Sequence, residues 1–425
     1  MRCSGFKRHV TGSWLIGFSR RRIRLVIDLA VGMTINQIAM GIAFITLARL
    51  AGPRETGLVA AFVGAFTVLT DIVDAGTSLW LQREISADRN TQSASARQVF
   101  SNKVWIASTV ALIAFLLIYT TQSSASLLWL PLWFFLTAVA QTVVSIHSGL
   151  GHFRLVGGLA ALDKSLALAT MLVTYTVVGE PVATGFCIGL ASGAAAQLAV
   201  SIALLGDKRS IGLSFRLRYA DFNGHRSFAM SAVFSDLQLA DTAIIAGTAG
   251  SYTAGLFAVP ARLSGPLGII PTAMARVLLT AATAANADTR LIMRRLPRLV
   301  PVLLLTYAVI GTAAWYVVVP IFGDSYKAAR TATVVVCIST GLAAYNQLAA
   351  TVLQAQRAER LVAFVVSFAM VLQLIGLAVV PHFFGVSGAA AVYLTMQTVI
   401  GLALYLRLRR EPLHGGATYN ADPSG

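Results

Sequence analysis

The sequence predicts an all-α integral membrane protein with about twelve transmembrane helices in two six-helix lobes. The chain has 425 residues, of which 56% are hydrophobic and only 12% are charged, whereas a soluble domain carries about 25% charged residues. Its apolar runs are long and continuous, which is typical of spanning helices and not of the alternating strands of a barrel. Helices also satisfy their own backbone hydrogen bonds in lipid.

Twelve apolar segments have about the 20 residues that a helix needs to cross a membrane. These segments are 25–48, 58–82, 103–121, 127–149, 157–178, 183–205, 227–247, 255–283, 298–320, 331–354, 361–381 and 386–406. We therefore divide the chain into a basic cytoplasmic segment (1–24), an N-terminal lobe (25–205), a cytoplasmic linker (206–226), a C-terminal lobe (227–406) and a cytoplasmic tail (407–425).

The basic residues predict the orientation of these spans. With the N-terminus inside, 26 of the 33 Lys and Arg residues lie in inner segments and four in outer ones, namely Arg49, Arg54, Lys327 and Arg330. This asymmetry is typical of the positive-inside rule. It explains the net charge of +16 by topology, so we expect membrane lipids and not nucleic acid as partners. The protein is predicted to be multi-pass in a bacterial-type inner membrane, with both termini cytoplasmic.

Several short sequence features occur in the same order in both halves of the chain. The turn after the first span, 50–58, and the turn after the seventh, 247–256, both contain glycine and both end in Gly-Leu. Arg-Leu-Val links the fourth span to the fifth at 154–156 and the tenth to the eleventh at 360–362. Because six spans per half is an even number, the halves are expected to insert in the same orientation, related by a pseudo-two-fold axis along the membrane normal.

Five short segments resemble the polysaccharide-export flippases of the multidrug/oligosaccharidyl-lipid/polysaccharide (MOP) superfamily. They are 48–58 (ARLAGPRETGL), 74–76 (DAG), 240–247 (ADTAIIAG), 255–263 (GLFAVPARL) and 322–326 (FGDSY). The resemblance runs from about residue 25 to 406, and it depends on the order of the segments. One departure is Thr253-Ala254, where the family often has a polar residue before glycine.

The resemblance implies two lobes around a central cavity that opens alternately to either side. It also implies a flippase that moves an undecaprenyl-pyrophosphate-linked oligosaccharide to the outer face of the membrane, for the biosynthesis of surface polysaccharide such as O-antigen or exopolysaccharide. Association with a polysaccharide polymerase and export machinery is a further expectation. Two alternatives stay open, an ion-coupled multidrug or small-molecule exporter of the same superfamily and an integral-membrane polymerase or ligase. The short outer loops argue against an enzyme.

Arg262 is the leading candidate for binding the substrate. It lies well inside the eighth span, where an arginine costs about 2.5–3.5 kcal/mol to insert, and its planar fork suits phosphate. An ion pair with Asp241 or Asp236 is the alternative explanation. Arg276 is fourteen residues further on nearly the same face, and Arg49 ends the first span; both can instead snorkel to headgroups. The spans also contain amides, including Gln37 and Gln238, which can bind sugar hydroxyls or connect helices.

The eighth span also carries a candidate hinge. Pro260, Gly265, Pro266 and Pro271 follow one another within twelve residues. Since proline removes a backbone donor and kinks a helix, we expect a bent or broken helix here, either as a hinge or as a static kink.

Four carboxylates within spans are candidates for ion coupling, namely Asp71, Asp74, Asp236 and Asp241. Buried carboxylates can bind H⁺ or Na⁺ and couple transport to a gradient, or they can pair with Arg or Lys. The sequence shows no Walker motif and no spacing typical of metal ligands. We therefore expect no metal and no cofactor beyond a coupling ion.

Overall fold

The computed structural model describes residues 20–87, 92–121, 125–206, 211–213, 240–268, 271, 275, 296–355 and 358–410. The first half contains α1 (Arg20–Asp74), α2 (Thr77–Ala87), α3 (Gln92–Thr121), η1 (Ala125–Trp129), α4 (Leu130–Gly149), α5 (Phe153–Val173), the π-helical turn η2 (Thr174–Val178) and α6 (Val182–Ala203). The second half contains α8 (Asp241–Ala249), α9 (Ser251–Ser264), η5 (Gly265–Gly268), η6 (Leu296–Arg298), α12 (Leu299–Phe322), η7 (Asp324–Tyr326), α13 (Ala329–Ala355) and α14 (Glu359–Arg410).

The chain has the all-α fold of a membrane protein with about twelve spans. Eight described helices are long and apolar enough to cross a membrane. Two of them, α1 and α14, are double-length helices that bend at Gly52 and Gly385, so each crosses twice. The shorter helices α8 and α9 are the described parts of the predicted seventh and eighth spans. Most of the predicted linker 206–226 lies outside the described residues.

The short glycine-containing turn predicted between the first two spans is a kink within one continuous helical run. Gly52 adopts φ 75° and ψ 174°, while helical structure resumes at once with Pro53. A positive φ is strained for any residue with a Cβ, and proline is tolerated in the first turn of a helix, where its missing N–H is not needed. Gly250, between α8 and α9, has nearly the same conformation, with φ 89° and ψ 157°. The two turns are thus equivalent in conformation as well as in sequence.

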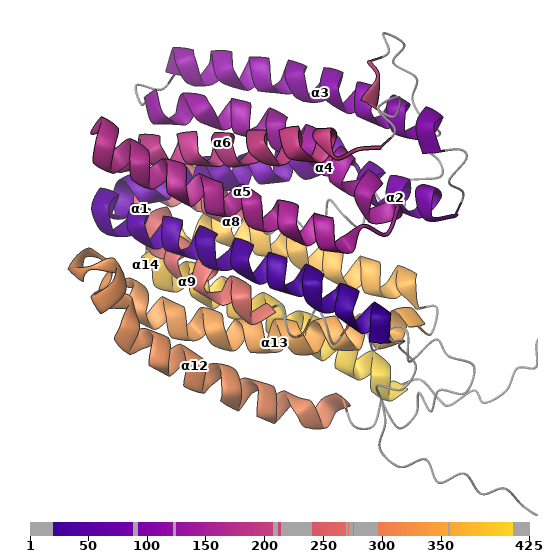
Figure 1. Cartoon of the computed structure of the whole chain (residues 1–425). Coiled ribbons are helices and arrows are strands. Elements are labelled where there is room, and N and C mark those ends of the chain that lie inside the picture. The colour runs from indigo at the N-terminus through magenta and orange to yellow at the C-terminus, as the bar shows by residue number, and fades with distance from the viewer. Residues whose placement is uncertain are drawn as a thin grey trace, which may run out of the picture.

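The two halves lie side by side, and α1 lies between them (Figure 1). Within its own half α1 packs mainly on α5. Across the seam, the boundary where the two halves meet, it packs on α8 and α9 of the second half. One apolar cluster belongs to the first half and includes Phe66, Phe134 and Phe186. A second cluster joins Phe44 and Ala48 of α1 to residues of the second half. The halves are therefore in contact along α1.

Candidate functional site

The helix that carries Arg262 is interrupted inside the bundle. The α-helical part of this segment ends at Ser264, and Gly265–Gly268 continue as a 3₁₀ turn that contains Pro266. The Tyr307 hydroxyl of α12 donates a hydrogen bond of 2.8 Å to the Leu267 carbonyl. This bond supplies one partner where the helix ladder is broken. The bent or broken helix predicted from the sequence is present, and its action as a hinge stays a prediction.

A cavity of about 530 Å³ lies next to this break, among α8, α9, α13 and α14. The break itself contributes Gly265 and Gly268 to the wall, and Pro271 lines it further along. Polar side chains come from all four helices. They are Asp241, Thr242, Arg262, Ser264, Thr340, Asn346, Gln347, Tyr393 and Gln397. The cavity is thus a polar chamber in the second half of a largely apolar bundle.

Arg262 stands at the edge of this chamber, on the seam between the halves. Its guanidinium lies over the Phe44 ring of α1, 5.9 Å from the ring centroid, which is within the range of a cation–π contact. It also borders Leu47 and Phe186 of the first half. Among the described residues the ion pairs are Lys103–Asp74 and Lys164–Asp163, so the alternative pairing of Arg262 with Asp241 is not made. Arg262 as a whole residue keeps exposed surface, and its guanidinium has an aromatic neighbour and no counter-ion among the described residues.

Asp241 lies across the chamber at the start of α8 and is only 5% exposed. Its Oδ1 atom has no hydrogen-bond partner among the described residues. Gln373 of α14 lies against both Asp241 and Tyr393, yet its amide nitrogen and oxygen also lack well-formed hydrogen bonds there. Burying such groups without partners costs several kcal/mol, about 1–3 for each neutral group and more for a charge. The cluster therefore has unused oxygens that a cation or a proton can satisfy.

Two further amides, Asn346 and Gln397, connect α13 to α14 in the wall of the chamber. The Asn346 side chain of α13 donates from Nδ2 to the Gln397 backbone oxygen at 2.8 Å and to its Oε1 at 2.9 Å. The Asn346 Oδ1 atom is buried without a partner among the described residues. These two amides connect helices, as amides within membranes often do, and the wall of the chamber keeps one more acceptor without a partner among the described residues.

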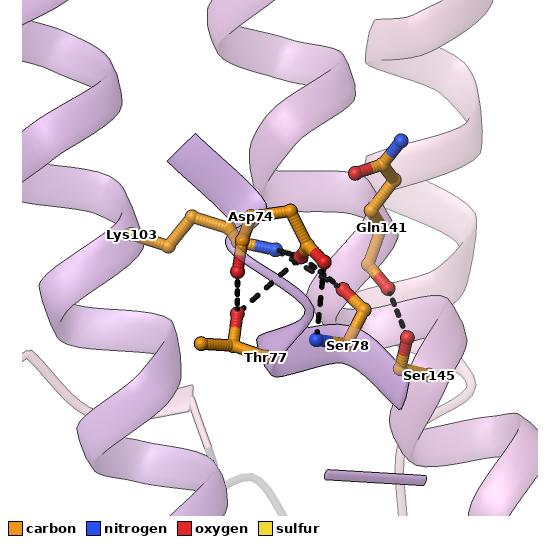
Figure 2. A network of polar contacts seen from close by, with 6 residues as sticks. All are labelled: Asp74, Thr77, Ser78, Lys103, Gln141 and Ser145. Carbon is orange, nitrogen blue, oxygen red and sulfur yellow. Dashed lines mark hydrogen bonds and ion pairs between the residues drawn. The ribbon is translucent and has the colours of Figure 1, made fainter. Parts of the chain in front are cut away.

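Asp74, by contrast, is fully engaged where α1 meets α2 (Figure 2). Lys103 of α3 forms a buried ion pair with it and also donates 3.1 Å to the Ser78 hydroxyl. The Ser78 backbone N–H donates to Asp74 Oδ2 at 3.3 Å, and the Thr77 hydroxyl donates to the Asp74 backbone oxygen at 2.6 Å. Asp74 thus closes one helix, caps the next and compensates a buried ammonium.

The other predicted residues are dispersed. Arg49 is exposed beside the Gly52 kink, and Asp71 is half-buried with contacts of its own one turn before Asp74. Gln37 is exposed two helical turns before Phe44 and on the same face of α1. Asp236, Gln238 and Arg276 lie outside the described residues. The structure therefore brings Arg262 and Asp241 together around one chamber. Gln37 lies on the same face of α1 as Phe44, the residue whose ring contacts Arg262.

The sequence alone did not assign Gln373 and Tyr393 to this site. Both belong to α14, twelve residues before and eight residues after the Gly385 kink. In a hairpin of two spans, residues at similar distances before and after the turn lie at similar depths in the membrane. This symmetry about Gly385 was the sequence signal that could have placed Gln373 and Tyr393 near each other. The described residues contain no group of three or more His, Cys, Asp and Glu that would hold a metal ion. One carboxylate with amide oxygens is a ligand set for a hard cation or a proton.

No protein-family model matches the chain, and no curated protein matches it either. Solved structures do match over nearly its whole length. The lipid II flippase MurJ, in an inward closed conformation, superposes with a TM-score of 0.68 at 11% identity, covering 92% of this chain and 88% of that chain. A MOP superfamily transporter from Pyrococcus furiosus superposes with a TM-score of 0.63 at 16% identity, covering 91% and 94%.

A MATE transporter of Vibrio cholerae, VcmN in its bent form, superposes with a TM-score of 0.58 at 14% identity, covering 91% of this chain and 96% of that chain. At these identities the matches establish the fold. The chain thus has the fold of MOP superfamily transporters, with two six-helix lobes related by a pseudo-two-fold axis.

Proposed function

We propose that this protein translocates an undecaprenyl-pyrophosphate-linked oligosaccharide from the cytoplasmic to the outer face of the inner membrane by alternating access. The observation that carries the proposal is the guanidinium of Arg262 on the seam between the lobes, which forms no ion pair within the part of the chain that the structure describes. Arg262 lies twelve residues from Gly250, which is about 18 Å along a helix and hence near the middle of a hydrocarbon core of about 30 Å.

A pyrophosphate that crosses hydrocarbon needs compensation of its negative charge along its path. Arginine provides this with several N–H donors in a planar fork. Because no described carboxylate neutralises Arg262, its charge is available to an anion. The Phe44 ring holds the guanidinium in place without consuming its hydrogen-bond donors. Gln37, on the same face of α1 as Phe44, is suited to contact the sugar or phosphate on the way to Arg262.

The Asp241 cluster supplies a means of coupling in this proposal. A bound Na⁺, or a proton on Asp241, would satisfy the orphaned Asp241 Oδ1 atom beside the Gln373 amide. Such an ion would stabilise one arrangement of α8, α13 and α14 and thereby bias the lobes toward one state. Arg262 and Asp241 line the same chamber, so an anionic headgroup at one and a cation at the other would affect each other's affinity.

The second candidate is an ion-coupled exporter of small organic molecules. It is favoured by the same Asp241 cluster and by the superposition on VcmN, a MATE transporter. Reconstituted vesicles separate the two candidates. We expect undecaprenyl-pyrophosphate-linked N-acetylglucosamine to become accessible to an impermeant lectin, and we expect ethidium efflux down an imposed Na⁺ or pH gradient to stay at the level of protein-free vesicles. Ethidium efflux without lipid flipping would replace the first candidate by the second.

Arg262→Ala tests the role of the guanidinium directly. We expect at least a tenfold loss of lipid flipping with an unchanged amount of protein in the membrane, because the guanidinium forms no ion pair among the described residues whose loss would destabilise the fold. Arg262→Lys keeps the charge but loses the planar fork, so it should recover only part of the rate. Full flipping by the alanine variant would remove Arg262 from the proposed role.

A further inference from the structure

Arg330, near the start of α13, is a second arginine without a counter-ion. Neither of the two ion pairs among the described residues includes it. Its guanidinium lies over the Trp315 ring of α12, 4.6 Å from the ring centroid, which is a close cation–π contact. The Nε atom is buried there and has no hydrogen-bond partner within the described part of the chain. An aromatic ring thus holds this arginine in place while part of its donor set stays unused.

The packing of α12 on α13 shows how deep the guanidinium lies. A Cβ built on Gly311 of α12 would lie 3.2 Å from the Val334 Cα of α13, which sets the register of this antiparallel pair. Trp315 lies four residues beyond Gly311 toward the outer end of α12, and Arg330 lies four residues before Val334. The guanidinium is therefore level with Trp315, seven residues or about 10 Å below the end of α12 at Phe322.

This part of α12 faces the surrounding lipid. The helix lies at the edge of the bundle (Figure 1), and the described residues that line the chamber beside Arg262 belong to other segments. Tyr316, next to Trp315, is 66% exposed. A long cationic side chain near the end of a span ordinarily extends toward the headgroups, whereas this one lies below the end of its neighbouring helix. The cost of such a position falls when the bilayer thins locally and brings headgroups closer.

Lys327 provides a second cation on the outer side of Arg330. The Arg330 backbone N–H donates 3.3 Å to the Lys327 carbonyl oxygen, so the two residues are one turn apart. Lys327 is exposed, and Asp324 in the same turn forms no ion pair with either cation among the described residues. Both are among the four basic residues that the predicted orientation places on the outer side, where basic residues are usually rare. An anion between them would be held by an ammonium above and a guanidinium below.

We propose that Arg330, Lys327 and Trp315 bind the phosphate of an anionic phospholipid in the outer leaflet. The phosphodiester accepts hydrogen bonds from the guanidinium and the ammonium, and its acyl chains continue along the apolar surface of α12. A lipid fits this position better than free phosphate does, because the guanidinium lies below the end of the span. The inference goes beyond the proposed function, since the site lies on the outside of the second half and away from the chamber.

Quenching of Trp315 fluorescence by brominated lipids tests the site without any transport. The protein is reconstituted in phosphatidylcholine vesicles that contain a minor fraction of brominated phosphatidylglycerol or, in the second arm, of brominated phosphatidylcholine. The signal of Trp315 is the part of the emission that Trp315→Phe removes. We expect brominated phosphatidylglycerol to quench this part at least twofold more strongly than brominated phosphatidylcholine. Inorganic phosphate in the buffer should not reduce the preference.

Arg330→Gln, again compared with its own Trp315→Phe partner, should abolish the preference, because it removes the charge and the planar fork. Arg54→Gln is the matched control, since it removes an exposed arginine from the same side of the membrane, and it should retain the preference. A merely structural role of Arg330 would change stability but not the choice between the two lipids.

Equal quenching by the two lipids in the native chain would overturn the proposal. So would a preference that survives Arg330→Gln, one that Arg54→Gln also abolishes, or one that inorganic phosphate removes, which would assign the site to a free anion. If Arg330→Gln does not accumulate, Lys327→Gln decides, because this exposed residue precedes α13. It should reduce the preference at least by half, and an unchanged preference would again overturn the proposal. Because no flipping is measured, failure of the proposed function would not affect this result.

Discussion

The surroundings of Asp74 and Asp241 show two opposite uses of a buried carboxylate. Asp74 is surrounded by Lys103, Thr77 and Ser78, and all of them are bonded to it. Asp241 is just as buried, but it has an orphaned oxygen, and both amide atoms of its neighbour Gln373 lack well-formed hydrogen bonds among the described residues. The first arrangement is complete within the protein, and its loss should damage the fold. The second is incomplete, and its loss should damage transport.

The largest effect on stability is expected from Lys103→Met, which leaves Asp74 buried without its counter-charge. Breaking a buried ion pair from one side costs about 3–5 kcal/mol, so the unfolding midpoint in detergent should fall markedly. The double variant Lys103→Met with Asp74→Asn removes both charges and should recover more than half of the loss. If the double variant is as unstable as the single one, the ion pair is not what stabilises this corner.

Asp241→Asn should have the opposite profile. The amide removes an uncompensated buried carboxylate without changing its shape, so thermal stability should hold or rise, while flipping falls at least tenfold, which corresponds to about 1.4 kcal/mol. Any stabilisation of the native protein by Na⁺ over choline, or by a change of pH, should also disappear. Asp324→Asn, in the exposed turn η7, is the control that should change nothing. A stable and fully active Asp241→Asn protein would contradict the coupling role.

The smallest effect in this series is expected from Tyr393→Phe. The change keeps the ring that packs near Phe257 and removes the hydroxyl next to Gln373. A neutral hydrogen bond contributes about 1 kcal/mol, so the concentration of coupling ion for half-maximal flipping should rise by about fivefold. Tyr316→Phe, on the exposed face of α12, should leave that concentration unchanged. A loss as large as that of Asp241→Asn would place Tyr393 at the centre of the site.

Much of the fold could be predicted from hydropathy and charge. The predicted span 183–205 corresponds to α6 at Val182–Ala203, and 298–320 corresponds to α12 at Leu299–Phe322. These boundaries were accessible because lipid forces each span to be long, apolar and helical. The kinks at Gly52 and Gly385 were not, since the same glycine and proline pattern also suits an open loop.

The site was harder to predict, because it depends on which side chains meet across helices. Arg262 and Asp241 stood out as charges within apolar runs, and both line the chamber. Lys103 was counted as an inner basic residue, yet it is 2% exposed and bonded to Asp74, which no local pattern reveals. Residues equivalent to Arg262 and Asp241 in the first half, 198 positions earlier, are Gly64 and Ala43. The repeat thus predicts the scaffold but not which half holds the charges.

Gly57 of α1 and Gly255 of α9 lie back to back, and a Cβ atom on either one would come within 1.8 Å of a backbone oxygen of the other half, which limits how such a chain can change over generations. If the two halves descend from a duplicated six-helix gene, the ancestral glycine faced its own copy in a symmetric dimer, and one codon controlled both sides. After fusion the two codons drift independently, but neither can accept a bulkier residue unless the facing backbone retreats. The centre of the duplication is therefore where the two descendants have the least freedom to diverge.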